Sequence, residues 1–150
     1  MHKTVEGWLE KSRSELDEVY SQASPGVVPD GDTRGTAIAV AFGSGYSKIV
    51  AAIARLFAWQ GKIFDLFTSD KQSGVLINKI TPFSASFIVA KVYRDASWLD
   101  GKETIVIDYS STSFIAKKIR DEIREVEPGV YLGKVWWGKK RILDFALTRT

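Results

Sequence analysis

From residue 61 onward the chain is a succession of short apolar segments separated by turn residues, and this spacing constrains the fold more than any other feature. Turn signals such as Asp100-Gly101 and Gly138-Lys139 separate neighbouring segments. Strands repeated at intervals of about ten residues predict an antiparallel sheet curled into a barrel or half-barrel. An α+β sheet with helices on one face is the alternative. The predicted strands cover residues 61–68, 74–81, 86–94, 102–109, 130–137 and 140–148.

The part of the chain before these strands predicts two helices and one further strand. Apolar residues recur at helical spacing over residues 4–23, which is typical of an amphipathic helix. A strand of small residues follows at 33–42, and residues 48–59 form a helix that is apolar nearly all round and is therefore buried. We predict a mainly β, single domain over residues 1–150, in which an N-terminal helix within residues 1–24 precedes a barrel over residues 33–150.

The composition excludes several kinds of active site. The chain has no cysteine, so it has neither a disulfide nor a thiolate nucleophile nor a cysteine zinc site. His2 is the one histidine, which excludes multi-histidine metal sites and a Ser-His-Asp triad within this chain. The glycine patterns of dinucleotide and phosphate-binding loops are absent. We therefore expect neither a cofactor nor a metal.

The charge distribution gives little support to a nucleic-acid partner. The chain has 21 Lys and Arg against 18 Asp and Glu, and the two signs are interleaved except in the basic stretch 134–141. The apolar run at 49–59 is shorter than the about 20 residues that a transmembrane helix requires. We expect a cytoplasmic protein without a transmembrane segment, and we leave a homodimer open.

The strand faces predict a binding cavity. Several predicted strands are apolar on both faces, and 12% of the residues are aromatic. An eight-stranded barrel has an interior wide enough for side chains or for one small ligand. We therefore expect a small apolar molecule, such as a lipid, a terpenoid or a polyketide, to bind inside. The aromatic residues expected to contact it are Trp59, Phe64, Tyr93, Trp98, Tyr131 and Trp136.

Polar residues within the apolar strands are the candidate catalytic groups. Asp65, Asp108 and Asp144 are each flanked by apolar residues, and Arg94 and Tyr109 lie at the ends of apolar runs. A carboxyl group in apolar surroundings has a raised pKa and can transfer protons. On this interpretation Asp108, Tyr109, Asp65 and Arg94 serve a cofactor-independent isomerase, cyclase or hydrolase. The alternative is that each group is paired with a basic side chain or a backbone amide. The sequence does not decide between an enzyme and a binding protein.

Six segments carry a resemblance to known proteins. They are WQGKIFD (59–65), KVYR (91–94), WLDGKE (98–103), DYS (108–110), IRDEIREV (119–126) and YLGKVW (131–136). On these segments the chain resembles a group of small bacterial proteins of unassigned function, over residues 30–148. It more loosely resembles the lipocalin-like (calycin) barrels, and that likeness implies a cup for a small apolar ligand. The inserted apolar helix departs from the calycin pattern.

Overall fold

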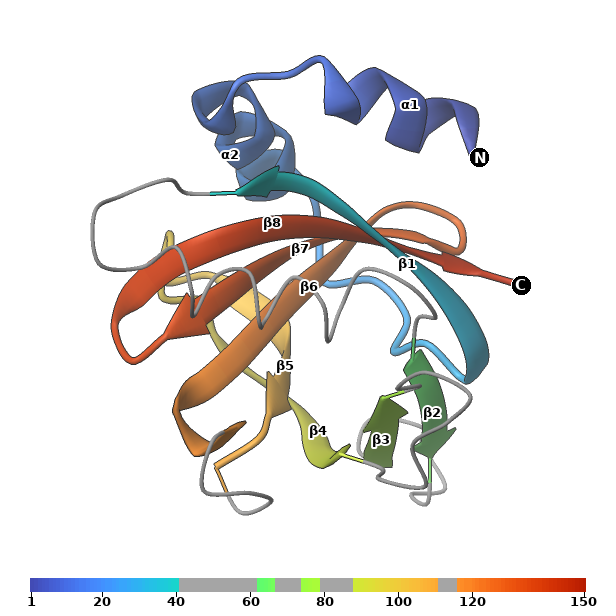
Figure 1. The fold of residues 1–150 in the computed structure, drawn as a ribbon, viewed down its shortest axis with the longest axis vertical. Helices are drawn as coiled ribbons and strands as arrows, with labels where there is room; N and C mark the ends of the chain where they lie inside the picture. Colours follow the sequence, from blue (N-terminus) through green and yellow to red (C-terminus); the bar gives the residue numbers. More distant parts are fainter. Residues whose placement is uncertain (41–61, 67–73, 79–87, 111–115) are drawn as a thin grey trace.

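The computed structural model describes residues 1–40, 62–66, 74–78, 88–110 and 116–150. These residues form a curved antiparallel sheet with two helices before it (Figure 1). The prediction of a mainly β, antiparallel fold is confirmed. The predicted apolar helix at 48–59 lies outside the described residues.

Six strands form the continuous part of the sheet. In chain order each is paired with the next from β4 to β8, and β8 is paired with β1 along most of its length. The 3₁₀ turn η1 (Ala116–Lys118) leads into β6. The six strands are β4 (Ile88–Ala96), β5 (Glu103–Asp108), β6 (Ile119–Glu127), β7 (Val130–Trp137), β8 (Lys140–Arg149) and β1 (Gly31–Val40).

Two short strands connect the ends of this arc. β2 (Lys62–Leu66) pairs with β3 (Gly74–Asn78), and β3 pairs with β4. β2 reaches β1 through two residue pairs, Gly31 with Phe64 and Asp32 with Ile63. The order of pairing is therefore circular, and its contact between β1 and β2 is much shorter than the others.

The N-terminal segment forms two helices, so the prediction of one helix was wrong. α1 (Lys3–Leu9) ends at Leu9, with Glu10 as its C-cap, and α2 (Arg13–Gln22) begins after Ser12. The Ser12 hydroxyl accepts a hydrogen bond from the Glu15 amide at 3.2 Å, and the Glu15 carboxylate accepts one from the Ser12 amide at 2.7 Å. This reciprocal pair is a capping box, which fixes a new helix start.

Side chains on the two faces of the sheet form two apolar clusters. The first lies inside the curve of the sheet and contains Ile105, Tyr109, Tyr131 and Phe145 among its buried members. The second lies between the outer face of the sheet and the two helices. Its buried members are Val5, Trp8, Leu16, Tyr20, Val130, Leu132 and Ala146. The helices therefore cover part of the outer face of the sheet.

A buried arginine joins α2 to the turn between β4 and β5. Arg124 on β6 donates two hydrogen bonds to the Asp100 carboxylate, at 2.6 and 2.7 Å. Its other three N–H groups reach the carbonyls of Tyr20, Lys102 and Glu103 at 3.0 to 3.1 Å. All five donors of the guanidinium are therefore used. This saturated arrangement fixes the turn at 97–102 against β6.

Candidate functional site

A row of polar and aromatic side chains crosses the outer face at the ends of adjacent strands. Asp108 on β5 is opposite Arg120 on β6, and Arg120 is opposite Trp136 on β7. Tyr93 on β4 lies one diagonal step from Asp108, because Lys91 is the direct partner of Asp108. Direct and diagonal neighbours on one face of a sheet are close enough for their side chains to interact. The register therefore assembles these groups from four strands.

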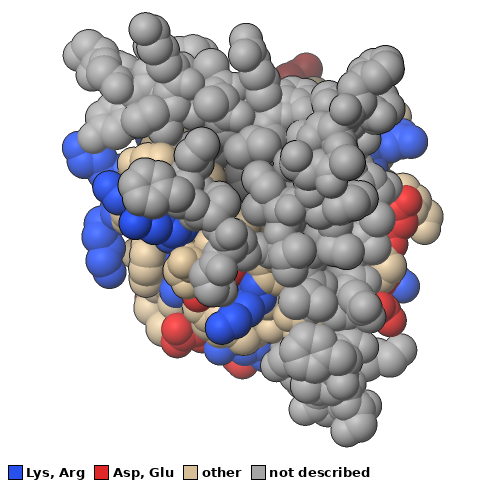
Figure 2. All heavy atoms as spheres, turned by 60° about the horizontal axis from the view of Figure 1, so that its bottom comes forward, with Lys and Arg blue, Asp and Glu red and all other residues tan. Residues whose placement is uncertain are grey.

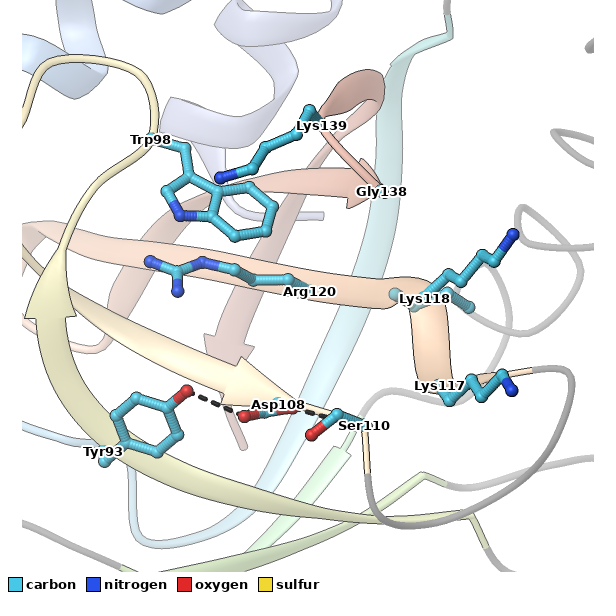
Figure 3. A pocket seen from close by; sticks show the side chains of 10 residues that line it. Tyr93, Trp98, Asp108, Ser110, Lys117, Lys118, Arg120, Gly138 and Lys139 are labelled. Atoms are coloured by element: carbon cyan, nitrogen blue, oxygen red, sulfur yellow. Dashed lines mark hydrogen bonds between the residues drawn. The ribbon is translucent and has the colours of Figure 1, made fainter.

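Three members of this row, Tyr93, Asp108 and Arg120, line a pocket of about 330 Å³ (Figure 3). The turn before β5 contributes Trp98, and the turn between β7 and β8 contributes Gly138 and Lys139. The volume is at the lower end of the range for small-molecule sites. The described residues that line it are Tyr93, Trp98, Asp108, Ser110, Lys117, Lys118, Ile119, Arg120, Gly138 and Lys139.

Asp108 is an ionised hydrogen-bond acceptor in this pocket. It accepts hydrogen bonds from the Tyr93 hydroxyl and the Ser110 amide, both at 2.8 Å. Burial alone raises the pKa of Asp108, but hydrogen bonds from Ser110 and Tyr93 and the charge of Arg120 outweigh it and lower the pKa. This direction is opposite to that expected of a carboxyl in apolar surroundings. Burial and the Asp108 carboxylate raise the pKa of Tyr93 to about 12, so Tyr93 remains a donor.

The Arg120 side chain is held in place by a buried carboxylate and a backbone carbonyl. Its guanidinium contacts the Glu122 carboxylate at 3.0 Å and donates to the Ala96 carbonyl at 2.8 Å. Glu122 is fully buried and also accepts hydrogen bonds from the Ser97 hydroxyl at 2.7 Å and the Trp98 amide at 2.9 Å. One carboxylate therefore positions both Arg120 and the backbone of Trp98.

The Trp98 indole is in contact with two cations. The Arg120 guanidinium carbon lies 4.3 Å from the ring centroid, and the Lys139 ammonium nitrogen lies 4.2 Å from it. Figure 3 shows the indole between these two side chains. Trp136 packs edge-on against Trp98, with centroids 5.8 Å apart and an interplanar angle of 71°. These contacts fix the plane of an indole that is 38% exposed.

The pocket is strongly basic. Among the described residues, Lys117, Lys118, Lys139 and Arg120 line it against one lining carboxylate, that of Asp108, and the Arg120 guanidinium is also paired with Glu122. Figure 2 shows Lys and Arg side chains at the left edge of this face and at other places on it, together with Asp and Glu side chains. Cations around a partly enclosed hollow concentrate anions from solution. The arrangement can therefore hold an anionic group next to an aromatic surface.

The pocket contains three of the residues that the sequence singles out, Tyr93, Trp98 and Asp108, and Trp136 packs beside it. Of these, Asp108 was predicted as a catalytic group and the others as ligand contacts. All four lie on the outer face of the sheet, whereas the sequence placed the ligand inside the barrel.

Three other predicted residues lie on the inner face. Tyr109 donates a hydrogen bond to Asp121 at 3.2 Å, and both side chains are buried in the described interior. The Tyr131 hydroxyl donates to the Val27 carbonyl at 2.7 Å. Arg94 donates to the Gly26 carbonyl at 2.6 Å. Tyr131 and Arg94 thus fix the loop before β1.

The remaining predicted residues are not part of the pocket described above. Trp59 lies outside the described residues, and for Phe64 and Asp65 only the strand backbone of β2 is described. Asp144 lies beneath α2, 3.2 Å from the buried ammonium of Lys134. Burial raises the pKa of Asp144, and Lys134 offsets this only in part.

The sequence reasoning missed the basic residues of the pocket and their support. Arg120, Glu122 and Arg124 stand at every second position of β6 and therefore share one polar face, and this signal was available. Lys139 belongs to the basic stretch 134–141. Its place beside Trp98 depends on contacts between distant turns, which no local pattern encodes.

Two features are absent from the described ranges. No group of three or more metal-ligating side chains occurs among these residues. Within the same residues, no helix has the length and apolar character required to cross a membrane.

Comparison with known proteins relates the chain to one solved structure. It superposes on the crystal structure of a protein from Thermomonospora curvata with a TM-score of 0.60 and 20% sequence identity. The match covers 99% of this chain and 94% of the other. At this identity the likeness shows the fold alone. No family model and no curated protein matches the chain.

Proposed function

We propose that this protein binds a small anionic molecule in the pocket on the outer face of the sheet. The observation that carries the proposal is the set of four basic side chains that line the pocket together with the exposed Trp98. Asp108, the one carboxylate among the described lining residues, already accepts hydrogen bonds from Tyr93 and Ser110. Positive charge therefore dominates the space that a ligand would occupy.

Two features make an anion a better ligand than a cation or a neutral sugar. The Arg120 side chain is only 12% exposed, so the part of its charge that Glu122 does not offset acts through a poorly solvated region. Lys139 and Lys118 are exposed and can turn toward a ligand. A carboxylate or phosphate would accept charge-assisted hydrogen bonds from these groups, and such bonds are stronger than neutral ones.

The test is a titration of the ¹⁵N-labelled protein with inorganic phosphate and with benzoate, followed by ¹H–¹⁵N NMR. We expect saturable shifts at the Trp98 indole N–H and at the amides of residues 117–120 and 138–139. In a Lys118→Gln, Lys139→Gln variant, binding should weaken about tenfold, because a hydrogen bond to a charged group contributes about 1.5 kcal/mol.

Lys11→Gln with Lys3→Gln is the matched control, because both residues are exposed and lie outside the pocket. This control should bind as the wild type does. Equal affinity for benzoate and for the neutral benzamide would contradict the proposal, as would unchanged binding in the pocket variant.

A second candidate function keeps the apolar ligand inside the sheet, as predicted from the sequence, and its support is the buried Tyr109–Asp121 hydrogen bond. Such a polar pair in an apolar cluster could hold a polar group of a ligand or transfer a proton to it. Titration with a fatty acid would test it. Binding that is weakened by Tyr109→Phe but not by Lys139→Gln would favour this candidate over the outer pocket.

A further inference from the structure

The two cations on Trp98 are held very differently. Arg120 has fixed partners in Glu122 and the Ala96 carbonyl, and its side chain is nearly buried. Lys139 follows Gly138 in an exposed turn, where Gly138 has a φ of 57°. Within the described part of the chain, the contact with the Trp98 ring is the interaction that Lys139 makes. One face of the indole is therefore covered by a side chain with other fixed partners, and the opposite face by a side chain whose contact with the ring is its interaction among the described residues.

The indole is ready to accept a flat group on the Lys139 side. Its orientation is set by the edge-on contact with Trp136 and by the hydrogen bond from the Trp98 amide to Glu122. An aromatic side chain that is fixed and exposed loses little freedom when a second ring stacks on it. An ammonium over an exposed ring is a weak contact, so replacing Lys139 costs little.

The size of the pocket limits what such a ligand can be. About 330 Å³ accommodates one ring system with its anionic group, but not a long acyl chain together with a headgroup. The basic residues Lys117 and Lys118 lie on the far side of the pocket from Trp98, and their side chains extend away from the indole (Figure 3). A ligand can therefore place a ring on the indole and direct its negative charge toward the side of the pocket that carries these lysines.

We infer that the ligand is a flat aromatic or conjugated molecule with a carboxylate or phosphate, whose ring stacks on Trp98 in the position that Lys139 occupies. This inference rests on the proposed function, because the same pocket receives the anionic group. It adds to that function the requirement that the ligand has a flat ring. It assigns Trp98 as the residue that determines specificity and Lys139 as a cover that the ligand displaces.

The test compares two carboxylates of similar size and equal charge, 2-naphthoate and decalin-2-carboxylate, with the whole chain by calorimetry. Only the first has a flat aromatic ring. The wild type should prefer 2-naphthoate by about fivefold, in line with the contribution of aromatic stacking beyond buried area. Upfield ring-current shifts of the naphthoate protons should accompany binding.

Three variants separate the outcomes. Trp98→Leu should lose both the preference and the ring-current shifts, and Trp98→Phe, which retains a ring, should keep part of each and report that the fold is intact. Lys139→Met should leave the preference in place, because the lysine is absent from the indole in the complex. A preference that survives Trp98→Leu would overturn the inference.

The failure of this inference and the failure of the proposed function give different results. If both carboxylates bind equally and both are weakened in the Lys118→Gln, Lys139→Gln variant, the pocket binds anions but has no preference for a flat ring. If inorganic phosphate and both carboxylates fail to bind the wild type, both proposals are wrong.

Discussion

Gly133 on β7 is a position where a single methyl group should measurably destabilise the fold. Gly133 is the direct partner of Phe145 on β8, and the phenyl ring lies over the glycine. A Cβ at position 133 would lie 2.3 Å from the Phe145 Cζ and 2.4 Å from its Cε1. Both distances are far inside van der Waals contact. An aromatic ring that covers a glycine in this way takes the place of the missing side chain.

The ring cannot easily move aside. Phe145 is 1% exposed and belongs to the inner apolar cluster, so a displaced ring must push its buried neighbours. Overpacking a filled core costs about 1–3 kcal/mol, and replacing glycine in a strand recovers about 0.5–1 kcal/mol of backbone entropy. We expect Gly133→Ala to lower the free energy of unfolding by about 1–2 kcal/mol. For a chain of this length, that lowers Tm by about 2–8 °C.

Urea unfolding followed by tryptophan fluorescence measures this change, and Gly7→Ala is the matched control. Gly7 lies in α1, and no atom lies within 4 Å of the point that an alanine Cβ would occupy, so the alanine should be neutral or stabilising by about 0.5–1 kcal/mol. The double variant Gly133→Ala, Phe145→Leu decides the cause. If the methyl group clashes with the ring, the double variant loses at least about 1 kcal/mol less than the two single changes together. Strict additivity would refute the reasoning.

Three further predictions concern the polar contacts. The pKa of Asp100 is lowered below its usual 3.8, chiefly by hydrogen bonds from Arg124, so this contact stabilises the fold above that pH and less as the pH falls through the lowered value. The stability advantage of the wild type over Asp100→Asn should therefore shrink in urea titrations below pH 3.8, and a constant difference would contradict it. Ser12→Ala removes the cap of α2 and should cost about 1 kcal/mol in thermal unfolding, whereas an unchanged Tm would show that packing alone sets the helix start. Tyr93→Phe removes a hydrogen bond that lowers the pKa of Asp108, so that pKa should rise in a ¹³C-carboxyl NMR titration; a fall or no change would count against this contact.

The strands were predictable because their signal is local. Apolar residues in runs bounded by Asp-Gly and Gly-Lys turns identify strands without knowledge of their partners. The observed strands β5, β7 and β8 begin and end within one residue of the predicted ranges. Their order of pairing was predictable too, because short turns join consecutive strands.

The break between α1 and α2 shows where the sequence reasoning used only part of the signal. Hydrophobic spacing continues through residues 4–23 as if the helix were unbroken. The Ser-x-x-Glu pattern at Ser12 and Glu15 indicates a new helix start, and it was present in the sequence. Periodicity reports which side chains face a core, but capping groups decide where the backbone hydrogen bonds begin.

The candidate site could be predicted in its parts but not as a whole. Asp108, Tyr93 and Trp98 stand out in the sequence one by one. What joins them is the register of β4, β5 and β6, which places Arg120 opposite Asp108. A shift of one residue would turn these side chains to the other face. The sequence also does not state which face of each strand points outward. The expectation of a ligand inside the barrel was therefore made without knowing on which face these side chains lie.

The two faces of the Trp98 indole are held by different parts of the structure. Glu122 is a buried carboxylate that fixes both the Arg120 guanidinium and the Trp98 amide, and Arg124 fixes the other end of the same turn through Asp100. Both anchoring residues, Glu122 and Arg124, lie on β6, so this one strand positions both Trp98 and the Arg120 side chain that covers one face of its indole. Lys139 comes from an exposed turn and has no such anchor among the described residues. Selectivity for a ring would therefore reside in the fixed half, and entry of the ligand would depend on the turn.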